Sequence, residues 1–283
     1  MQLVSWNIQW GRGCDGRVDL ARIVAHARRF ADFDVLCLQE VSAGYPELPG
    51  SDGGDQFDAL ARLLPGYQAI EAVATDSPGP GGSRRRFGNL LLSRLPLGPV
   101  YRHLLPWPAD PAVPSMQRVA LEATVHAPGG PLRVITTHLE WYSPLQRAAQ
   151  VERLRELQRE GHAQAVTARP ASQTPGPFDP VPRGVPAVVV GDFNFRPATP
   201  EHQRLQAPID AATPGWRDAW ELLHPGQPHP PSVGLYDQQQ WPGPPFTMDF
   251  AFVSEDLAPK VRELRFDPSS DASDHQPLLL TLA

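Results

Sequence analysis

Polar side chains interrupt or end the short apolar runs of this sequence, and their types are those that bind cations and move protons. They are acids, amides and imidazoles only: Asn7, Glu40, His138, Asp192, Asn194, Asp249, Asp274 and His275. A single Asp or Asn at the end of a strand is ordinarily a cap or turn former. Their recurrence from one run to the next instead favours one shared site.

The chemistry of these residue types indicates a hard divalent cation. Carboxylate and amide oxygens suit Mg²⁺, Mn²⁺ or Ca²⁺, whereas a zinc site would need more His or Cys ligands. With both His and Asp present, a site of this kind could polarise a phosphate, activate water and protonate a leaving oxygen.

The elements that position these residues are predicted mainly as strands. The continuous apolarity of Ala187–Val190 predicts a central strand covered on both faces, and the alternation in Arg118–Val125 predicts a half-exposed antiparallel strand. Further apolar runs of strand length, rich in β-branched or aromatic residues, lie at Leu3–Ile8, Val35–Leu38, Leu90–Leu92, Leu132–Thr137, Phe250–Val253 and Leu278–Leu282.

Two segments between these runs have the period of a helix. Asp19–Phe30 carries apolar residues at helical spacing, which predicts an amphipathic helix. Ser143 and Gln146 match a capping box and predict the start of a second helix, which ends at Gly161 or continues to about Val166.

Segments rich in Gly and Pro are predicted as long loops: Asp76–Arg86, Arg169–Pro186 and His224–Pro245. No linker and no internal repeat divides the chain, so residues 1–283 are expected to form a single domain. Strands dominate both halves, and we expect them to form two packed sheets with the helices outside.

Composition narrows the classes of partner and the location. The net charge is −6 and Lys260 is the only lysine, which argues against a protein built to coat nucleic acid. No apolar run approaches the roughly 20 residues that span a bilayer, and the first residues lack a secretory pattern, so the expected location is the cytoplasm. Cys14 and Cys37 make neither a disulfide framework nor a thiolate metal site.

The polar positions and their surroundings resemble the endonuclease/exonuclease/phosphatase superfamily. The matching segments occur in the family's order: Ser5–Ile8, Leu38–Val41, Asn89–Arg94, Thr137–Leu139, Gly191–Asn194 and Ser273–Pro277. This resemblance implies a deoxyribonuclease-like α+β fold of four layers, with two packed, mostly antiparallel sheets flanked by helices. It also implies an enzyme that hydrolyses phosphoric esters with the help of a divalent metal.

The resemblance implies a role for each matched position near the metal. Glu40 would be the principal metal ligand, assisted by Asn7 and Asp274. Asp192 would orient or deprotonate the attacking water, and Asn194 would hold the phosphate.

The histidines would act on the phosphoryl group. His275 would stabilise charge that grows on the phosphoryl oxygens, with Asp249 fixing its tautomer and orientation. His138 stands where family members with a second histidine place a phosphate contact or a leaving-group acid.

Arginines and aromatic residues supply further candidates for substrate binding. Arg84, Arg85 and Arg86 lie before the Asn89 strand, and Arg118 precedes another strand. Arginine offers a bidentate fork to phosphate, although a solvated charge cluster explains the three neighbours as well. In the loop that carries them, Tyr236 and Trp241 could stack on a substrate group or pin that loop by packing.

The sequence therefore predicts a hydrolase of phosphodiesters or phosphomonoesters that uses Mg²⁺ or Mn²⁺ and acts on a small or lipid-derived substrate. The alternative within the enzymes is a nuclease for DNA or RNA. A further alternative is a non-catalytic module that binds a phosphorylated partner.

Overall fold

Twelve strands form two six-stranded sheets in the computed structural model, which describes residues 1–167, 176–179 and 181–283. In spatial order the first sheet consists of β11 (Val261–Phe266), β12 (Leu278–Leu282), β1 (Gln2–Asn7), β2 (Val35–Ala43), β4 (Arg84–Ser93) and β3 (Gln68–Pro78). The second consists of β5 (Leu97–Leu104), β6 (Val119–Ala127), β7 (Gly130–His138), β8 (Ala187–Asp192), β10 (Asp249–Ser254) and β9 (Trp216–Asp218).

Both sheets are mostly antiparallel, and each has one parallel pair near its centre. In the first sheet the parallel pair is β1 with β2, and in the second it is β7 with β8. The remaining neighbours pair antiparallel. Since parallel strands need long crossovers, helices connect these pairs over the outer faces of the sheets.

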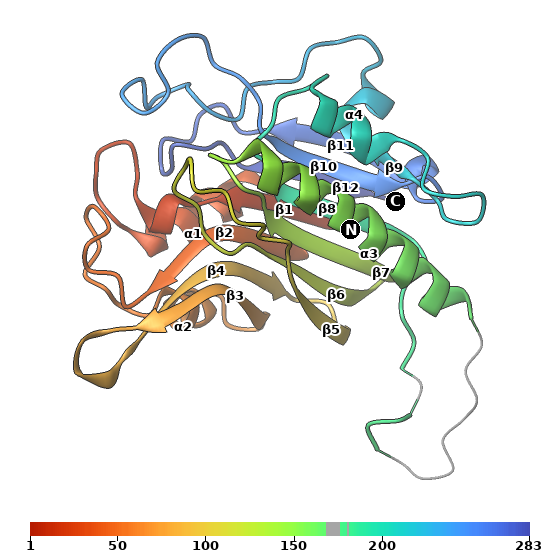
Figure 1. Ribbon diagram of the computed structural model, residues 1–283, viewed down its shortest axis with the longest axis horizontal. Helices are drawn as coiled ribbons and strands as arrows, with labels where there is room; N and C mark the ends of the chain where they lie inside the picture. Colours follow the sequence, from red (N-terminus) through yellow and green to blue (C-terminus); the bar gives the residue numbers. More distant parts are fainter. Residues whose placement is uncertain (168–175, 180) are drawn as a thin grey trace.

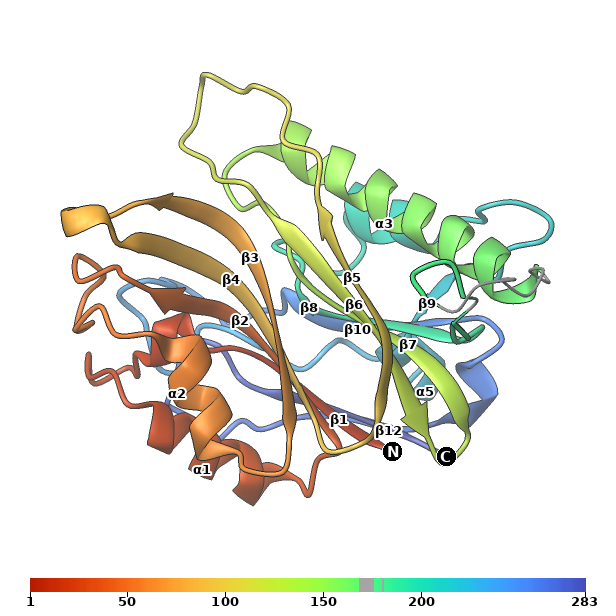
Figure 2. The ribbon, with the colours of Figure 1, turned by 90° about the horizontal axis from the view of Figure 1, so that it is seen from below.

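The helices form the two outer layers of the sandwich (Figures 1 and 2). The first sheet is covered by α1 (Leu20–Phe30) and α2 (Gln56–Leu63), and the second by α3 (Pro144–Val166) and α4 (Pro200–Gln206). Shorter elements are α5 (Ala219–Leu223), η1 (Gln9–Gly11), η2 (Pro80–Gly82) and η3 (Ala258–Lys260).

Strand alternation divides the core into three apolar clusters. Residues such as Leu3 and Val134 lie in the central cluster between the sheets. Their neighbours along the strands, such as Val4, lie in the cluster under α1 and α2 or in the cluster under α3 and α4. The period of two therefore decides which polar residue at a strand end faces the space between the sheets.

The predicted fold class is confirmed, and so are several elements. The helix predicted from Asp19 is α1, with Asp19 as its cap. Ser143 caps α3, which continues past Gly161 to Val166. The Ala187–Val190 strand is buried on both faces, as predicted.

Two predictions about secondary structure are wrong. The Arg118–Val125 segment is not half-exposed, because β6 is buried on both faces from Val119 to Val125. The Asp76–Arg86 segment is not a loop, because β3 runs to Pro78 and pairs with β4 from Arg84 onward. The predicted Arg169–Pro186 loop lies partly at 168–175 and 180, outside the described residues. Among those described, no helix is both long and apolar enough to cross a membrane.

Candidate active site

The sandwich brings polar strand ends together at one end of the space between the sheets. Asn7 ends β1 on the same face as Leu3, which lies in the central cluster. In the second sheet His138, Asp192 and Asp249 are direct neighbours across β7, β8 and β10. They share the inner face with Val134, Val190 and Ala251, so alternation alone points them at the first sheet.

A β-bulge delivers Glu40 to the same place. The pairing of β2 with β4 shifts register between Leu38 and Val41, and Glu40 has a φ of 60°. Leu38 and Val41 both face the outer cluster, so the bulge leaves Gln39 and Glu40 together on the inner side. A left-handed conformation in a residue other than glycine costs on the order of 1–3 kcal/mol and is typical of functional sites.

The Asn7 side chain links acids from both sheets. Its Nδ2 donates to Glu40 Oε1 at 3.1 Å and to Asp192 Oδ2 at 3.0 Å. Its Oδ1 accepts from the Gln9 backbone at 3.1 Å. The amide therefore has a fixed orientation, and it holds the two carboxylates close together.

The His275 ring is oriented by a hydrogen-bonded chain. Its Nδ1 lies 2.8 Å from Asp249 Oδ2, and the Ser232 hydroxyl donates to that same oxygen at 2.6 Å. This leaves His275 Nε2 directed at Asp192 Oδ2, 3.7 Å away. An acid that accepts from Nδ1 fixes the ring tautomer.

His138 and Asn194 complete the surroundings of Asp192. His138 Nε2 lies 3.5 Å from Asp192 Oδ2. Asn194, with a φ of 53°, donates its backbone N–H to Asp192 Oδ1 at 3.0 Å and its Nδ2 to the Leu139 carbonyl at 2.8 Å. Gly191 must be glycine, because a Cβ there would lie 1.9 Å from the Thr137 carbonyl oxygen.

The buried acids raise one another's pKa values. Burial, and then the charge of Asp274, raises the pKa of Glu40 above its ordinary value. Burial raises the pKa of Asp192 to about 7, although the charge of His275 acts in the opposite direction. A raised pKa means that the positive charge near these acids does not compensate for their burial and mutual repulsion.

The two histidines are shifted in opposite directions. Burial lowers the pKa of His138 well below its ordinary value, and the charges of Arg118 and His275 add to the effect. Burial also acts to lower the pKa of His275, but the charges of Asp249, Asp274 and Asp192 outweigh it and hold that pKa well above its ordinary value. At neutral pH one ring is therefore neutral and the other is a cation.

This donor set fits a hard divalent cation. Glu40 and Asp274 offer carboxylate oxygens, which are ligands such a cation prefers. Asn7 faces these acids with its Nδ2, because its Oδ1 accepts from the Gln9 N–H. Arg118 lines the cavity but is paired with Glu140 at 3.2 Å, and the pKa of Glu40 stays raised despite its charge. A cation among these acids would relieve the repulsion that raises their pKa values.

A second cluster of His and Asp does not fit a metal. His202 Nε2 and His229 Nε2 lie 2.9 Å and 2.8 Å from Asp218 Oδ2. His202 Nδ1 accepts from the Ala198 backbone N–H at 3.3 Å, so the ring proton is on Nε2. That tautomer donates to Asp218 and leaves the His202 ring no lone pair for a cation, which favours a structural role for the cluster.

The loop predicted over His224–Pro245 reaches into the site. It brings Gln240 there, a residue that the sequence analysis did not identify. Gln240 Nε2 and Trp241 Nε1 donate to Asp274 Oδ2 at 2.8 Å and 3.0 Å. The Trp241 ring also contacts Trp141 edge-on, with centroids 5.4 Å apart. Trp241 therefore both pins the loop and lines the site, whereas Tyr236 is bound to the Pro268 carbonyl outside it.

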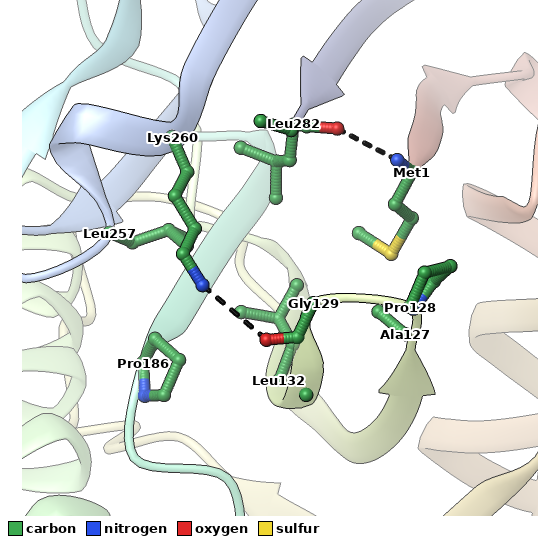
Figure 3. Close-up of a pocket in the computed structure, with 11 residues that line it drawn as sticks. Met1, Ala127, Pro128, Gly129, Leu132, Pro186, Leu257, Lys260 and Leu282 are labelled. Carbon is green, nitrogen blue, oxygen red and sulfur yellow. Dashed lines mark hydrogen bonds between the residues drawn. The ribbon is translucent and has the colours of Figure 1, made fainter.

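The cavity at this site has a volume of about 420 Å³, which suits a small ligand. Its lining comprises Glu40, Phe87, Met116, Arg118, His138, Trp141, Tyr142, Asp192, Asn194, Gln240, Trp241 and His275. A second hollow, between the chain termini and Lys260, has only about 50 Å³ and no acid or histidine in its lining (Figure 3).

The structure brings only one of the four candidate arginines to the cavity. Arg118 lines it and is 6% exposed, rather than being an exposed residue at a strand start. Arg84, Arg85 and Arg86 do not line it, and each is neutralised by an acid: Arg84 by Asp76, Arg85 by Glu47, and Arg86 by Asp55 and Glu71. Ion pairs with acids on β3 and on the segment between β2 and α2 account for this arginine cluster without a phosphate.

The sandwich and its cluster of acids, amides and imidazoles define a class, the metal-dependent hydrolases of phosphoric esters. The chain belongs to the endonuclease/exonuclease/phosphatase family, whose model matches residues 4–275. No curated protein matches the sequence.

Several solved structures are similar to this chain. An endonuclease/exonuclease/phosphatase from Beutenbergia cavernae is 28% identical, with 99% of this chain and 70% of that chain covered and a TM-score of 0.68. A mannosyl-6-phosphatase from Bacteroides thetaiotaomicron is 15% identical (100% and 99% covered, TM-score 0.64). The human nocturnin catalytic domain with bound sulfate is 19% identical (100% and 94% covered, TM-score 0.64). At such identities the last two show a shared fold alone.

Proposed function

We propose that this chain, acting as one catalytic domain, hydrolyses a small or lipid-derived phosphoester by attack of water on phosphorus, with Mg²⁺ or Mn²⁺ as its cofactor. One observation carries the proposal. Asp192 Oδ2 is surrounded by the Asn7 amide at 3.0 Å, His138 Nε2 at 3.5 Å and His275 Nε2 at 3.7 Å. An acid, a neutral imidazole and a cationic imidazole thus converge where one phosphoryl group would fit.

The metal would be held by Glu40 and Asp274, with Asn7 beside them. When bound, it supplies positive charge that polarises the phosphoryl group and stabilises the charge of the transition state. Mg²⁺ and Mn²⁺ suit a set of carboxylate oxygens, and the absence of a cysteine from this set disfavours softer metals.

Asp192 acts on the attacking water. A buried carboxylate that is held in place beside the attacking water can act as its general base. The Asn194 backbone N–H and the Asn7 amide fix its two carboxylate oxygens. Asp192 therefore orients the water and takes its proton as the bond to phosphorus forms. The P–O bond to the alcohol breaks, and the leaving oxygen takes a proton from solvent water.

The imidazoles and Asn194 bind the phosphoryl oxygens. His275 is a cation at neutral pH and stabilises negative charge that develops there, and Asp249 keeps its Nε2 directed into the cavity. His138 is neutral because its pKa is lowered, so we assign it a hydrogen bond to the phosphate rather than proton donation to the leaving group. Asn194 adds a second neutral hydrogen-bonding group for the phosphoryl oxygens.

Small phosphoesters are favoured over nucleic acid by the charges around the cavity. Binding of a duplex gains affinity from many cationic contacts to phosphates. Among the described residues that line the cavity, Arg118 is the one arginine and it is neutralised by Glu140. The nuclease is the second candidate because Trp141 and Tyr142, which are 40% and 56% exposed, offer rings on which a base could stack.

A panel of phosphoesters with purified protein tests this proposal. Alkyl and sugar phosphates, phosphodiesters, single-stranded and duplex DNA and RNA are incubated with Mg²⁺, Mn²⁺ or chelator. We expect metal-dependent release of phosphate or alcohol from a small ester at a higher kcat/KM than from any nucleic acid. Efficient cleavage of nucleic acid at physiological salt, with small esters untouched, would establish the nuclease instead.

A further inference from the structure

A groove lined by aromatic and apolar side chains opens directly beside the active-site cavity. It has a volume of about 640 Å³, and its large apolar side chains are Trp10, Tyr45, Leu48, Phe87, Trp107 and Met116. Phe87 and Met116 also line the active-site cavity, so the two spaces share a wall. We call these six residues the aromatic groove.

The polar atoms of its aromatic residues are already bonded within the protein. Trp10 Nε1 donates to the Pro49 carbonyl at 3.1 Å, and Trp107 Nε1 donates to Ser115 Oγ at 2.9 Å. The Tyr45 hydroxyl lies 3.5 Å from Ser77 Oγ. The groove therefore presents ring faces and methyl groups to a ligand and has few hydrogen bonds to offer.

The position of Trp10 is set by the same turn that orients Asn7. Gln9 and Trp10 both have left-handed backbone conformations, with φ of 44° and 45°. The Gln9 N–H donates to Asn7 Oδ1, and Gln56 Nε2 donates to the Trp10 carbonyl at 2.7 Å. Strain held by surrounding bonds is typical of functional positions. The turn at Gln9 and Trp10 therefore connects the groove with the Asn7 amide of the active site.

The groove has no positive charge of its own. Among the described residues that line it there is no arginine or lysine, and its one acid, Asp76, pairs with Arg84. The neighbouring Arg85 pairs with Glu47 at 2.7 Å. A chain of phosphates would find no counterion here, so the occupant is uncharged and apolar.

We propose that the aromatic groove binds an apolar substituent, an alkyl chain or an aryl ring, on the ester oxygen of the substrate whose phosphoryl group occupies the active site. This inference rests on the proposed function, because that function places the phosphoryl group in the cavity that Phe87 and Met116 also line. Burial of the substituent against the rings gives specificity for apolar esters, in the manner of other small-ligand sites.

A binding experiment tests the groove without any turnover. Isothermal titration calorimetry compares methyl, butyl, hexyl and phenyl phosphates in the presence of Ca²⁺, with each ester below its micelle-forming concentration. A fully buried methylene contributes about fourfold in affinity and an open groove covers roughly half of it, so we expect about twofold per methylene, or about thirtyfold from methyl to hexyl phosphate. The phenyl ester separates a preference for rings from a preference for chains.

Trp107→Ala and Tyr45→Ala remove two walls of the groove. Each should reduce the hexyl-to-methyl affinity ratio about fivefold or more, and Trp107 is 50% exposed, so its loss should not unfold the protein. Phe178→Ala is the matched control, since Phe178 is an aromatic residue that is 88% exposed and lines neither space. The control should keep the wild-type ratio.

A turnover experiment then separates the two proposals. With Mg²⁺ or Mn²⁺, phosphate release from hexyl phosphate should show a kcat/KM at least tenfold above that from methyl phosphate, and Trp107→Ala should lower this ratio. A wild-type affinity that does not depend on chain length overturns the groove, whether or not esters are hydrolysed. Affinity that rises with chain length without any hydrolysis supports the groove and overturns the proposed function.

Discussion

Two glutamates in the interior of this protein have opposite electrostatic surroundings. Glu40 lies at the mouth of the sandwich beside Asp274 and Asp192, and its pKa is raised, first by burial and then by Asp274. Glu122 lies on the outer face of the second sheet under α3, where Arg183 Nη2 approaches it to 2.6 Å. Burial alone would raise the pKa of Glu122 too, but His103 and the arginines Arg133 and Arg183 lower it overall.

The difference distinguishes a structural ion cluster from a functional one. The Glu122 cluster contains its own counterions, so it is complete in the folded chain. In the Glu40 cluster the cationic ring of His275 faces Asp249, Asp274 and Asp192. The pKa of Glu40 nevertheless stays raised, so the cluster can accept a further cation. Variants of the two clusters should therefore separate activity from stability.

The largest effect should come from removing the cation or its main ligand. Chelator should abolish hydrolysis, and Glu40→Gln should lower kcat/KM by about 10³-fold, since a catalytic metal contributes several kcal/mol. In chelator, the melting temperature of Glu40→Gln should equal or exceed that of the wild type, because the glutamine amide replaces a buried acid whose pKa is raised. Wild-type activity of the variant, or a large fall in its melting temperature, would contradict the functional reading of this cluster.

His275 and Asp249 should show the next largest effect, and as a unit. His275→Gln should lower kcat by about 10²- to 10⁴-fold with little change in KM, as expected for a group that acts in the transition state. Asp249→Asn should cost somewhat less. The double variant should be little worse than His275→Gln. Losses that multiply would show that Asp249 does not act through the ring.

Glu122→Gln should affect stability instead of activity. It leaves Arg133 and Arg183 without their buried partner, which costs about 3–5 kcal/mol in the free energy of unfolding. The kcat/KM should stay within about twofold of the wild type if the variant is measured where it is folded. Glu156→Gln is the control, because that acid is 48% exposed in its pair with Arg153 and such pairs contribute about 0–1 kcal/mol.

The stability that Glu122 contributes should also depend on pH. Its pKa in the folded state is lowered below its ordinary value of 4.5. The contribution should therefore be complete above pH 4.5 and disappear as the pH falls through the folded-state pKa. Urea unfolding of the wild type and Glu122→Gln at a series of pH values from neutral to acidic measures this difference. A difference that grows on acidification would reverse the assignment.

Much of the candidate site could be predicted from the sequence, because the alternation of side chains along a strand and the polar residue at its end are visible in a short segment. Strand ends at Asn7, His138 and Asp192 suffice to place polar groups on one inner face. The bulge at Glu40 does not follow, since it exists only in the pairing of β2 with β4. The roles of Ser232 and Gln240 do not follow either, because their contacts depend on the path of a long loop.

The charged residues that the sequence leaves ambiguous have their partners on distant segments of the chain, which a local pattern does not show. The alternation around Glu122 indicates a half-exposed strand, yet arginines from elsewhere cover it. Of the two ends predicted for the second helix, the later one is observed, because α3 continues past Gly161 to Val166. A Cβ at Gly161 would be 1.9 Å from the Arg133 guanidinium, so a glycine fits at this place in the helix. Arg84 to Arg86 resemble a phosphate site, yet acids on neighbouring segments neutralise them.

The smallest predicted effect concerns the donors around Asp274, which are neutral and displaceable, in contrast to the arginines around Glu122. Asp274 Oδ2 accepts from both Gln240 Nε2 and Trp241 Nε1, so a cation competes with these donors for that oxygen. Trp241→Phe keeps the ring and removes one donor. A net hydrogen bond contributes about 1 kcal/mol, and metal affinity should therefore tighten by roughly fivefold.

Calorimetric titration with Mn²⁺ measures this change, and Trp107→Phe is the matched control because its indole N–H bonds Ser115 instead. The control should bind Mn²⁺ as the wild type does. Weaker binding by Trp241→Phe would mean that the indole orients Asp274 for the metal rather than competing with it, since loss of an orienting partner lowers metal affinity about 10- to 100-fold. In that case the donors around Asp274 would be as fixed a part of their cluster as the arginines are around Glu122.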